Sequence, residues 1–503
     1  MLRKIRIALA TIFFAGITLL FLDVTGTLHA WLGWMAKIQF LPAVLALNIV
    51  VVAVLLLLTL LFGRVYCSVI CPMGVMQDII SWIHGKTAKK NRFRFSYSPA
   101  VNWLRYGMLA LFIIMLVAGV NSLVALFAPY SAYGRIASNL FAPIYQLGNN
   151  LFAWIAERAD SYAFYSSEVW IRSGATFAIS AVTFAVISIL AWKNGRTWCN
   201  TICPVGTVLG FVSRFSIFAP VIDTEKCRNC GLCGRQCKSS CINMKEHEID
   251  YSRCVACMDC IDACKEGAIH YALRRRSFAA AQDDRKAAQE NKVKDAGRRA
   301  FMTSTAIAVS ATALKAQEIK MDGGLAEIER AEKPERKTPL IPAGSLSLKH
   351  FSQHCTACQL CVSNCPNGVL RPSTSLMTLM QPEMSYERGY CRPECNTCSQ
   401  VCPAGAIRPI SVEEKSSIQI GHAVVNLGNC VVNTDGVNCG NCARHCPAGA
   451  IKLVRKNPED KNSLRIPVVN EERCIGCGAC ENLCPARPFT AIHIEGHEVH
   501  REL

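Results

Sequence analysis

The chain has 503 residues, of which 51% are hydrophobic and 18% charged, and its mean hydropathy is positive. The apolar residues are concentrated in the first 215 positions, which predicts a membrane domain followed by soluble modules. The formal net charge of +17 lies largely in loops and in one linker, so it does not indicate a nucleic-acid-binding protein. The 29 cysteines, without a leading secretory signal, favour a reducing compartment over a disulfide scaffold.

Four segments within the first 215 residues lack Lys, Arg, Asp and Glu and are predicted to span a membrane. They are 7–22, 38–63, 106 to about 129, and 173–192. A bilayer needs about 20 apolar residues per helix, and the first segment can use its flanking residues. Basic residues outside these spans place both ends of the four-helix unit in the cytoplasm. Residues 136–156 are also uncharged, but their Asn, Gln and Pro residues favour an interfacial or re-entrant segment.

A motif of the form G-R-x-aromatic-C-x3-C-P follows two of these spans. The first copy contains Cys67 and Cys71, and the second contains Cys199 and Cys203, both on the predicted cytoplasmic side. Two helix pairs related by an approximate two-fold axis would bring these four thiols together. Because C-x3-C places two sulfurs on one helical face, the repeat indicates redox-active or metal-ligating thiols. A structural turn that docks the neighbouring soluble module is the alternative.

Six four-cysteine runs occupy the remainder of the chain. They begin at Cys227, Cys254, Cys355, Cys391, Cys430 and Cys474. Four runs are regular C-x2-C-x2-C-x3-C sequences, and the runs at Cys391 and Cys430 are stretched. Three closely spaced cysteines bind three corners of a [4Fe–4S] cubane, and the fourth ligates the neighbouring cluster. Structural zinc would use two separated cysteine pairs, and disulfides would favour dispersed cysteines, so both are disfavoured.

The runs therefore predict three two-cluster ferredoxin modules of α+β fold that hold six [4Fe–4S] clusters. The predicted ligand sets are Cys227, Cys230, Cys233 and Cys264; Cys254, Cys257, Cys260 and Cys237; Cys355, Cys358, Cys361 and Cys402; Cys391, Cys395, Cys398 and Cys365; Cys430, Cys439, Cys442 and Cys484; and Cys474, Cys477, Cys480 and Cys446. One assignment is open, because Cys241 could replace Cys237. In this first module Lys238 and Lys265 stand where proline follows four of the other runs.

Between residues 271 and 350 the sequence changes to a polar linker with an internal twin-arginine-like signal or fifth hydrophobic segment. Arg298 and Arg299 are followed by Phe301 and by a short, weakly apolar stretch. This pattern is typical of a signal that exports folded domains already loaded with clusters. A basic linker before an ordinary soluble helix is the alternative. The pattern predicts that the first ferredoxin is cytoplasmic and that the later runs are periplasmic.

Four domains follow from these patterns. Residues 1–215 form an α-helical membrane domain with four transmembrane helices, and 216–270 form a cytoplasmic two-cluster ferredoxin. Residues 271–350 are the linker, and 351–503 form an exported four-cluster polyferredoxin. The sequence contains no P-loop, dinucleotide fingerprint or haem-attachment motif, so nucleotide cofactors and covalent haem are not indicated.

The first 270 residues resemble the NapH type of membrane polyferredoxin, through the four spans, the two C-x3-C-P motifs and the cytoplasmic ferredoxin. Residues 297–503 resemble the NapG type of twin-arginine-exported ferredoxin, which also interrupts its second and third motifs. The chain thus resembles a fusion of the two. The resemblance implies a multi-pass protein of the bacterial inner membrane that links the quinol pool to a periplasmic reductase or cytochrome, in a nitrate-reductase-type respiratory chain.

Two further cofactors would fit an electron-transfer protein of this kind. They are a quinone and an additional metal centre on Cys67, Cys71, Cys199 and Cys203. Whether the chain acts like a quinol dehydrogenase is open, as are the terminal acceptor and the direction of electron flow. One alternative function is a membrane ferredoxin that assists assembly or metal reduction for a respiratory metalloenzyme. Another is a docking or signalling role for the membrane half.

Overall fold

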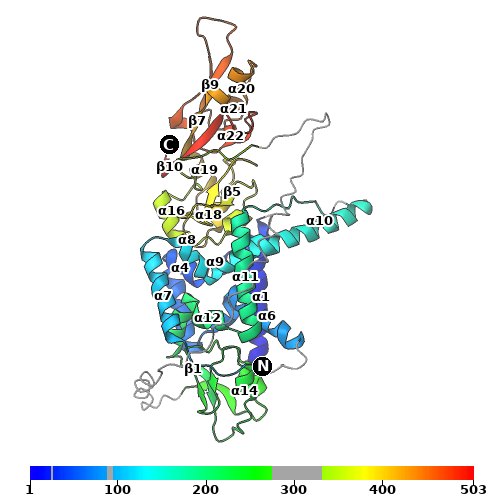
Figure 1. Cartoon of the computed structure of the whole chain (residues 1–503), viewed down its shortest axis with the longest axis vertical. Helices are drawn as coiled ribbons and strands as arrows, with labels where there is room; N and C mark the ends of the chain where they lie inside the picture. Colours follow the sequence, from blue (N-terminus) through cyan, green and yellow to red (C-terminus); the bar gives the residue numbers. More distant parts are fainter. Residues whose placement is uncertain (24–25, 88–94, 162, 275–330, 503) are drawn as a thin grey trace, which may run out of the picture.

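The computed structural model describes residues 1–23, 26–87, 95–161, 163–274 and 331–502. A helical domain, residues 1–215, occupies the middle of an elongated molecule (Figure 1). Residues 218–273, here the N-terminal ferredoxin, lie at one end of it, and residues 331–502, here the C-terminal ferredoxin, lie at the other. The two groups of cysteine runs are therefore separated by the helices.

Two helices are long and apolar enough to cross a membrane by length and composition. They are α1 (Leu2–Leu22) and α11 (Gly174–Asn194), with mean hydropathies of 2.3 and 2.0, and both run along the long axis in Figure 1. They match the first and fourth predicted spans. Large apolar side chains are exposed along both helices, for example Ile12 and Val182, which is typical of a surface that contacts lipid or a partner.

The second and third predicted spans are not continuous helices. Residues 38–63 divide into α4 (Phe40–Leu45) and α5 (Ile49–Phe62), and residues 106–129 divide into α7 (Asn102–Val117) and α8 (Asn121–Phe127). The breaks contain Leu47 with φ 53° and Gly119 with φ 76°, conformations that a right-handed helix cannot include. The prediction of four spans is therefore supported by two helices, while α5 and α7 are shorter apolar helices.

The uncharged segment that begins at residue 136 continues a buried helix and then becomes exposed. All residues of α9 (Pro129–Ile136) are buried, and the π-helix η2 (Ala137–Phe141) continues it. In α10 (Ala142–Arg158) only Ala153 is buried, and this helix projects sideways from the molecule (Figure 1). This shape suits the predicted interfacial segment, which stays a prediction. Two short helices, α2 (Thr27–Leu32) and α3 (Trp34–Lys37), connect α1 to α4.

Both copies of the C-x3-C-P motif fold in the same way. In the first, Gly63 has φ 73° and ends α5; the π-helix η1 (Tyr66–Ile70) follows, and α6 (Pro72–Thr87) begins at the motif's proline. In the second, Gly195 has φ 68°, and α12 (Thr197–Thr201) and α13 (Pro204–Ser213) follow. Proline fits the first turn of a helix because that position needs no N–H donor.

The N-terminal ferredoxin consists of two small antiparallel sheets and two short helices. The strands β1 (Phe218–Ile222) and β4 (Ile269–Leu273) pair and join its two ends, while β2 (Ile242–Asn243) pairs with β3 (Glu248–Ile249). The helices α14 (Leu232–Gln236) and α15 (Asp259–Ala263) contact each other. Each helix lies within a cysteine run and ends at its fourth cysteine.

The C-terminal ferredoxin contains three two-stranded antiparallel sheets. They are β5 (Leu370–Pro372) with β6 (Pro382–Met384), β7 (Ile418–Val425) with β10 (Ile492–Glu502), and β8 (Ile451–Arg455) with β9 (Arg465–Val469). The short helices are α16 (Leu348–His354), α17 (Leu360–Ser363), α18 (Thr397–Val401), α19 (Val412–Ser417), η5 (Leu427–Asn429), α20 (Val431–Thr434), α21 (Asn441–Arg444), η6 (Glu471–Arg473) and α22 (Ala479–Asn482).

This unit begins earlier than the predicted boundary at residue 351. Leu340 and Ile341 are buried, and the Leu340 carbonyl accepts a hydrogen bond from Met384 N at 2.9 Å. Arg336 forms a buried ion pair with Glu481. Leu340 and Ile341, which are flanked by prolines, therefore pack in the core of this unit, although the sequence pattern assigns them to the linker.

Candidate functional site

The four regular cysteine runs share one backbone conformation. In each run the second and fourth residues after the first cysteine have positive φ, and these residues are Asn229, Gly231, Ala256, Met258, Ala357, Gln359, Gly476 and Gly478. Non-glycine residues adopt this conformation at a cost. Alternation of right- and left-handed residues turns successive N–H groups toward one concavity, an arrangement found around phosphate and Fe–S sites. The loops therefore fit an anionic iron–sulfur cluster.

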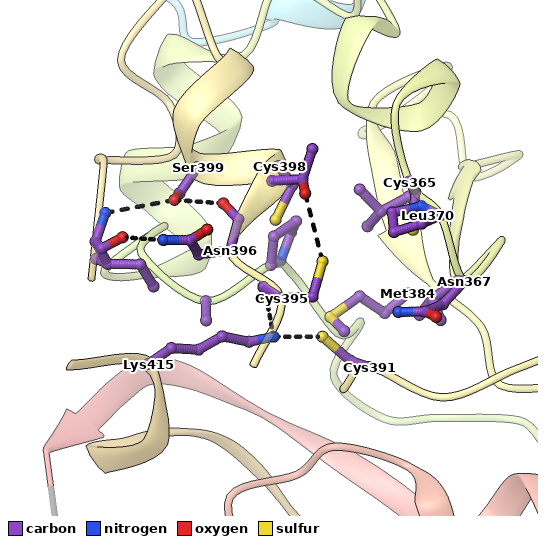
Figure 2. Close-up of a pocket in the computed structure, with 16 residues that line it drawn as sticks. Cys365, Asn367, Leu370, Met384, Cys391, Cys395, Asn396, Cys398, Ser399 and Lys415 are labelled. Atoms are coloured by element: carbon purple, nitrogen blue, oxygen red, sulfur yellow. Dashed lines mark hydrogen bonds between the residues drawn. The ribbon is translucent and has the colours of Figure 1, made fainter. Parts of the chain in front are cut away.

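Three predicted ligand sets line cavities in the structure. Cys355, Cys358, Cys361 and Cys402 surround one cavity. Cys365, Cys391, Cys395 and Cys398 surround a second, shown in Figure 2. Cys254, Cys257, Cys260 and Cys237 line a third together with Cys241, whose sulfur lies 3.5 Å from that of Cys237. The choice between Cys237 and Cys241 therefore stays open.

The other three predicted sets are also brought together. Burial raises the pKa of Cys442 to about 11, with further increases from the charges of Cys439, Cys484 and Cys430. Burial likewise raises the pKa of Cys480, with contributions from Cys477, Cys474 and Cys446. In the N-terminal ferredoxin, Cys233 interacts with Cys227 and Cys230, and Cys264 packs against the same buried cluster.

The sets of the C-terminal ferredoxin are linked in series. Within each pair of runs, the fourth cysteine of one run completes the ligand set of the other. This exchange joins the set that contains Cys358 to the set that contains Cys391, and it joins the set that contains Cys477 to the set that contains Cys442. Between these pairs, Cys391 N donates a hydrogen bond to Cys477 O at 2.9 Å. The loop of Cys358 packs on the helical domain, because a Cβ on Gly134 would lie 2.4 Å from Cys358 O. The helix α21, which contains Cys442, lies toward the far end of the molecule (Figure 1). The four sets therefore follow one another away from the helices.

Sequence reasoning missed Lys415 of α19. This side chain is 7% exposed, and its ammonium donates to the Cys391 sulfur at 3.2 Å, as Figure 2 shows. It also donates to the carbonyls of Arg392 and Cys395. Burial raises the pKa of Cys391, and the positive charge of Lys415 opposes that increase. No local pattern singles out this lysine, because it reaches the cysteine loop from a helix 24 residues further along the chain.

The two C-x3-C-P motifs interlock through their arginines. Arg64 of the first copy donates to Cys199 O of the second at 3.2 Å, and Arg196 of the second donates to Cys67 O of the first at 2.7 Å. Both guanidinium groups are fully buried. This reciprocal exchange is what the predicted two-fold relation requires. The glycine that follows each proline by two residues has a matching role, because a Cβ on Gly74 would lie 2.2 Å from Cys67 O.

The four thiols of these motifs are buried, with exposed fractions of 3–5%. Cys203 lies close enough to Cys199, Cys71 and Cys67 to interact electrostatically with each. Gln77 donates to the Cys199 sulfur at 3.2 Å. Among the described residues, no three His, Cys, Asp or Glu side chains are grouped closely enough to hold a single metal ion. The additional metal centre on these thiols stays a prediction.

An ion network joins the helical domain to the N-terminal ferredoxin. Asp78 of α6 accepts from Arg6 and Arg196, each at 2.9 Å, and lies 3.6 Å from Lys238. Lys238 also pairs with Asp259 at 2.9 Å. Burial alone would raise the pKa of Asp78, but the three cations hold it well below its usual range. Lys238 therefore replaces the expected proline because its side chain connects the two domains.

The C-terminal ferredoxin contacts the opposite end of the helices. Asn364 donates to Leu20 O of α1 at 3.1 Å, and Asn139 of η2 donates to Gln359 Oε1 at 2.8 Å. At its other end, α1 contacts the N-terminal ferredoxin, because Arg3 pairs with Asp259 at 2.8 Å. Seventeen residues at 1.5 Å per residue place these two contacts about 26 Å apart along the helix.

Comparisons with known proteins identify the same modules. A family model described as a 4Fe-4S binding domain matches residues 44–91 and 174–220, which are the two halves of the internal repeat. A second 4Fe-4S binding domain model matches 247–270, and a 4Fe-4S dicluster domain model matches 435–487. No solved structure matches the chain.

Several curated proteins are similar to parts of the chain. An uncharacterized protein of Methanocaldococcus jannaschii is 25% identical over 250 residues, which cover 50% of this chain and 80% of that protein. The ferredoxin-type protein NapH of Haemophilus influenzae is 27% identical over 239 residues, 46% of this chain and 69% of NapH. The methylamine utilization ferredoxin-type protein MauM of Methylobacillus flagellatus is 31% identical over 152 residues, 29% of this chain and 64% of MauM. The chain is therefore an iron–sulfur electron-transfer protein that contains 4Fe–4S ferredoxin domains and is similar to NapH.

Proposed function

We propose that the protein conducts electrons across a bacterial inner membrane, between the quinol pool and a periplasmic reductase of the nitrate-reductase type. The helical domain crosses the membrane in four passes, as the NapH resemblance implies. The N-terminal ferredoxin holds two of six clusters in the cytoplasm, and the C-terminal ferredoxin holds four in the periplasm. Arg298 and Arg299, which lie outside the described residues, direct the export of the second unit.

The observation that carries the proposal is the position of α1. Its Arg3 contacts one ferredoxin and its Leu20 contacts the other, so the two groups of cysteine runs lie at opposite ends of one apolar helix. The exposed apolar side chains along α1 and α11 support a lipid environment between them. NapH itself is described as a ferredoxin-type protein, which supports the electron-transfer role.

The path needs a carrier between the two ferredoxins, because about 26 Å of helix is too far for a single electron hop. Cys67, Cys71, Cys199 and Cys203 are suited to this role, since they converge inside the helical domain. Their burial argues against thiol exchange with another protein, which needs an accessible thiolate. In this proposal they act as redox-active thiol pairs near the cytoplasmic end, and a bound quinone completes the path.

The test uses the full-length protein in membrane vesicles with a short-chain quinol as reductant. Replacing Cys67 and Cys199 by Ser is expected to abolish cluster reduction by the quinol. Dithionite, which needs no internal path, should still reduce the clusters, and iron should stay at about 24 atoms per chain for six cubanes. Electron paramagnetic resonance and iron analysis report these quantities separately.

Three outcomes would contradict parts of the proposal. Full quinol reduction in the double variant would leave the four cysteines with a packing role. An iron content near about 16 atoms would remove one two-cluster module. Absence of quinol reduction in the unmodified protein, with all clusters present, would reject the link to the quinol pool.

A further inference from the structure

Arg135 occupies an unfavourable position unless a negative charge accompanies it. The residue lies in the last turn of α9, its exposed fraction is 0%, and none of its three guanidinium nitrogens has a hydrogen-bond partner among the described residues. An unpaired charge in the interior costs several kcal/mol. By contrast, the buried Arg336 of the C-terminal ferredoxin forms an ion pair with Glu481. Arg135 therefore needs a counter-charge of another kind.

The neighbour that can supply this charge is the first cysteine loop of the C-terminal ferredoxin. A Cβ on Gly134 would lie 2.4 Å from Cys358 O, so α9 packs directly on this loop. One turn further along, Asn139 holds the Gln359 side chain at 2.8 Å. Burial lowers the pKa of Arg135, and the charge of the nearby Cys358 opposes that decrease.

The Cys358 loop is also the one that fits a cluster by its backbone. Ala357 and Gln359 on either side of it have φ of 48° and 65°, and the loop lines a cavity with Cys402. A [4Fe–4S] cluster on four thiolates carries a net negative charge of roughly −2 when oxidised. Its sulfur atoms accept N–H hydrogen bonds, and such bonds are known to set cluster potentials.

We infer that Arg135 is the counter-charge, supplied by the helical domain, of the cluster held by Cys355, Cys358, Cys361 and Cys402. Its guanidinium would donate to the inorganic sulfur atoms of a cluster bound there and would neutralise part of the cluster's charge. A nearby positive charge stabilises the reduced form, which carries one more electron, so Arg135 raises the reduction potential of this cluster. Arg135 would thereby favour the site of Cys355, Cys358, Cys361 and Cys402 as the first acceptor on that side.

This inference goes beyond the proposed electron path but depends on its ligand assignment. The test compares Arg135→Met and Arg135→Lys in the full-length, cluster-loaded protein, because both side chains are unbranched and only lysine keeps the charge. Redox titration followed by electron paramagnetic resonance is expected to show one cluster shifted to lower potential in the methionine variant. The lysine variant should stay close to the unmodified protein, and the other clusters should not move.

Arg388→Gln is the matched control, because Arg388 crosses the same interface but is 30% exposed and paired with Glu168. Its loss should leave the potential of this cluster unchanged. Selective loss of this cluster's iron in the methionine variant alone would report the same need for charge. Unchanged potentials in both Arg135 variants, or equal changes in both, would assign Arg135 to packing and overturn the inference. Full iron content in Cys358→Ser would instead reject the ligand assignment.

Discussion

The two ferredoxins attach to the helical domain through interfaces of different chemistry. At the N-terminal ferredoxin, Asp78 and Asp259 are surrounded by arginines and Lys238, so charges contributed by both domains are paired within the protein. At the C-terminal ferredoxin, the buried contacts are neutral hydrogen bonds, such as those of Asn364 and Asn139, together with the unpaired Arg135, and the ion pair of Arg388 with Glu168 is partly exposed.

This difference bears on how the two units are assembled. Buried ion networks are costly unless every partner is in place, which suits a ferredoxin that folds next to the helices that precede it in the chain. A neutral amide that is exposed before docking costs little free energy, because water satisfies its hydrogen bonds. The second interface therefore suits a unit that folds elsewhere and arrives with its clusters, as the proposed export requires.

The largest expected effect comes from changing where the second unit is delivered. Replacing Arg298 and Arg299 by Lys should leave the C-terminal ferredoxin on the cytoplasmic side, because the proposed signal requires the arginine pair and not merely positive charge. Protease added to spheroplasts should digest residues 349–503 in the unmodified protein and spare them in the variant. The N-terminal ferredoxin should be protected in both.

The control for this experiment replaces Lys292 and Lys294 by Arg, which changes two other cations of the same linker and creates no arginine pair. Export should then be unaffected. Protection of residues 349–503 in the unmodified protein would show that the proposed topology is wrong.

A large but local effect is expected at the first interface. Asp78→Asn would leave Arg6, Arg196 and Lys238 buried without their shared carboxylate, at a cost of about 3–5 kcal/mol. The N-terminal ferredoxin should detach from the helices, which hydrogen exchange of α6 and α15 would detect. Because the folded pKa of Asp78 is lowered, its contribution is complete above the unfolded value of about 3.9 and is lost only as the pH falls below it. Stability should therefore not vary with Asp78 ionisation between about pH 6 and pH 8.

Asp223→Asn is the matched control in the same ferredoxin. Asp223 pairs with Lys226 three residues away, and the lysine is 67% exposed. Exposed pairs of this kind contribute little, so no detachment is expected. Similar exchange in the Asp78 and Asp223 variants would show that the network does not hold the interface.

The cysteine loops could be predicted from sequence because their ligands are close together in the chain. The reciprocal contact of the two C-x3-C-P motifs was also foreseeable, since repeated sequences fold alike and pair by symmetry. The breaks at Leu47 and Gly119 were not, because an apolar run does not show whether its helix is continuous. The roles of Lys238, Lys415 and Arg135 depend on partners distant in sequence, and no local spacing marks them.

The smallest expected effect tests the neutral character of the second interface. Asn364→Ala removes the hydrogen bond to Leu20 O and leaves this buried carbonyl of the α1 terminus without that donor. Loss of one such bond costs about 1 kcal/mol, so the C-terminal ferredoxin should stay docked but show faster hydrogen exchange in α17. Asn433→Ala changes the same type of side chain at an exposed position of α20, where Asn433 accepts from Lys456, and should leave α17 unchanged. Because the bond to Leu20 is uncharged, added salt should not alter the difference in α17 exchange rate between the two variants. If salt removes that difference, charges dominate this interface as well.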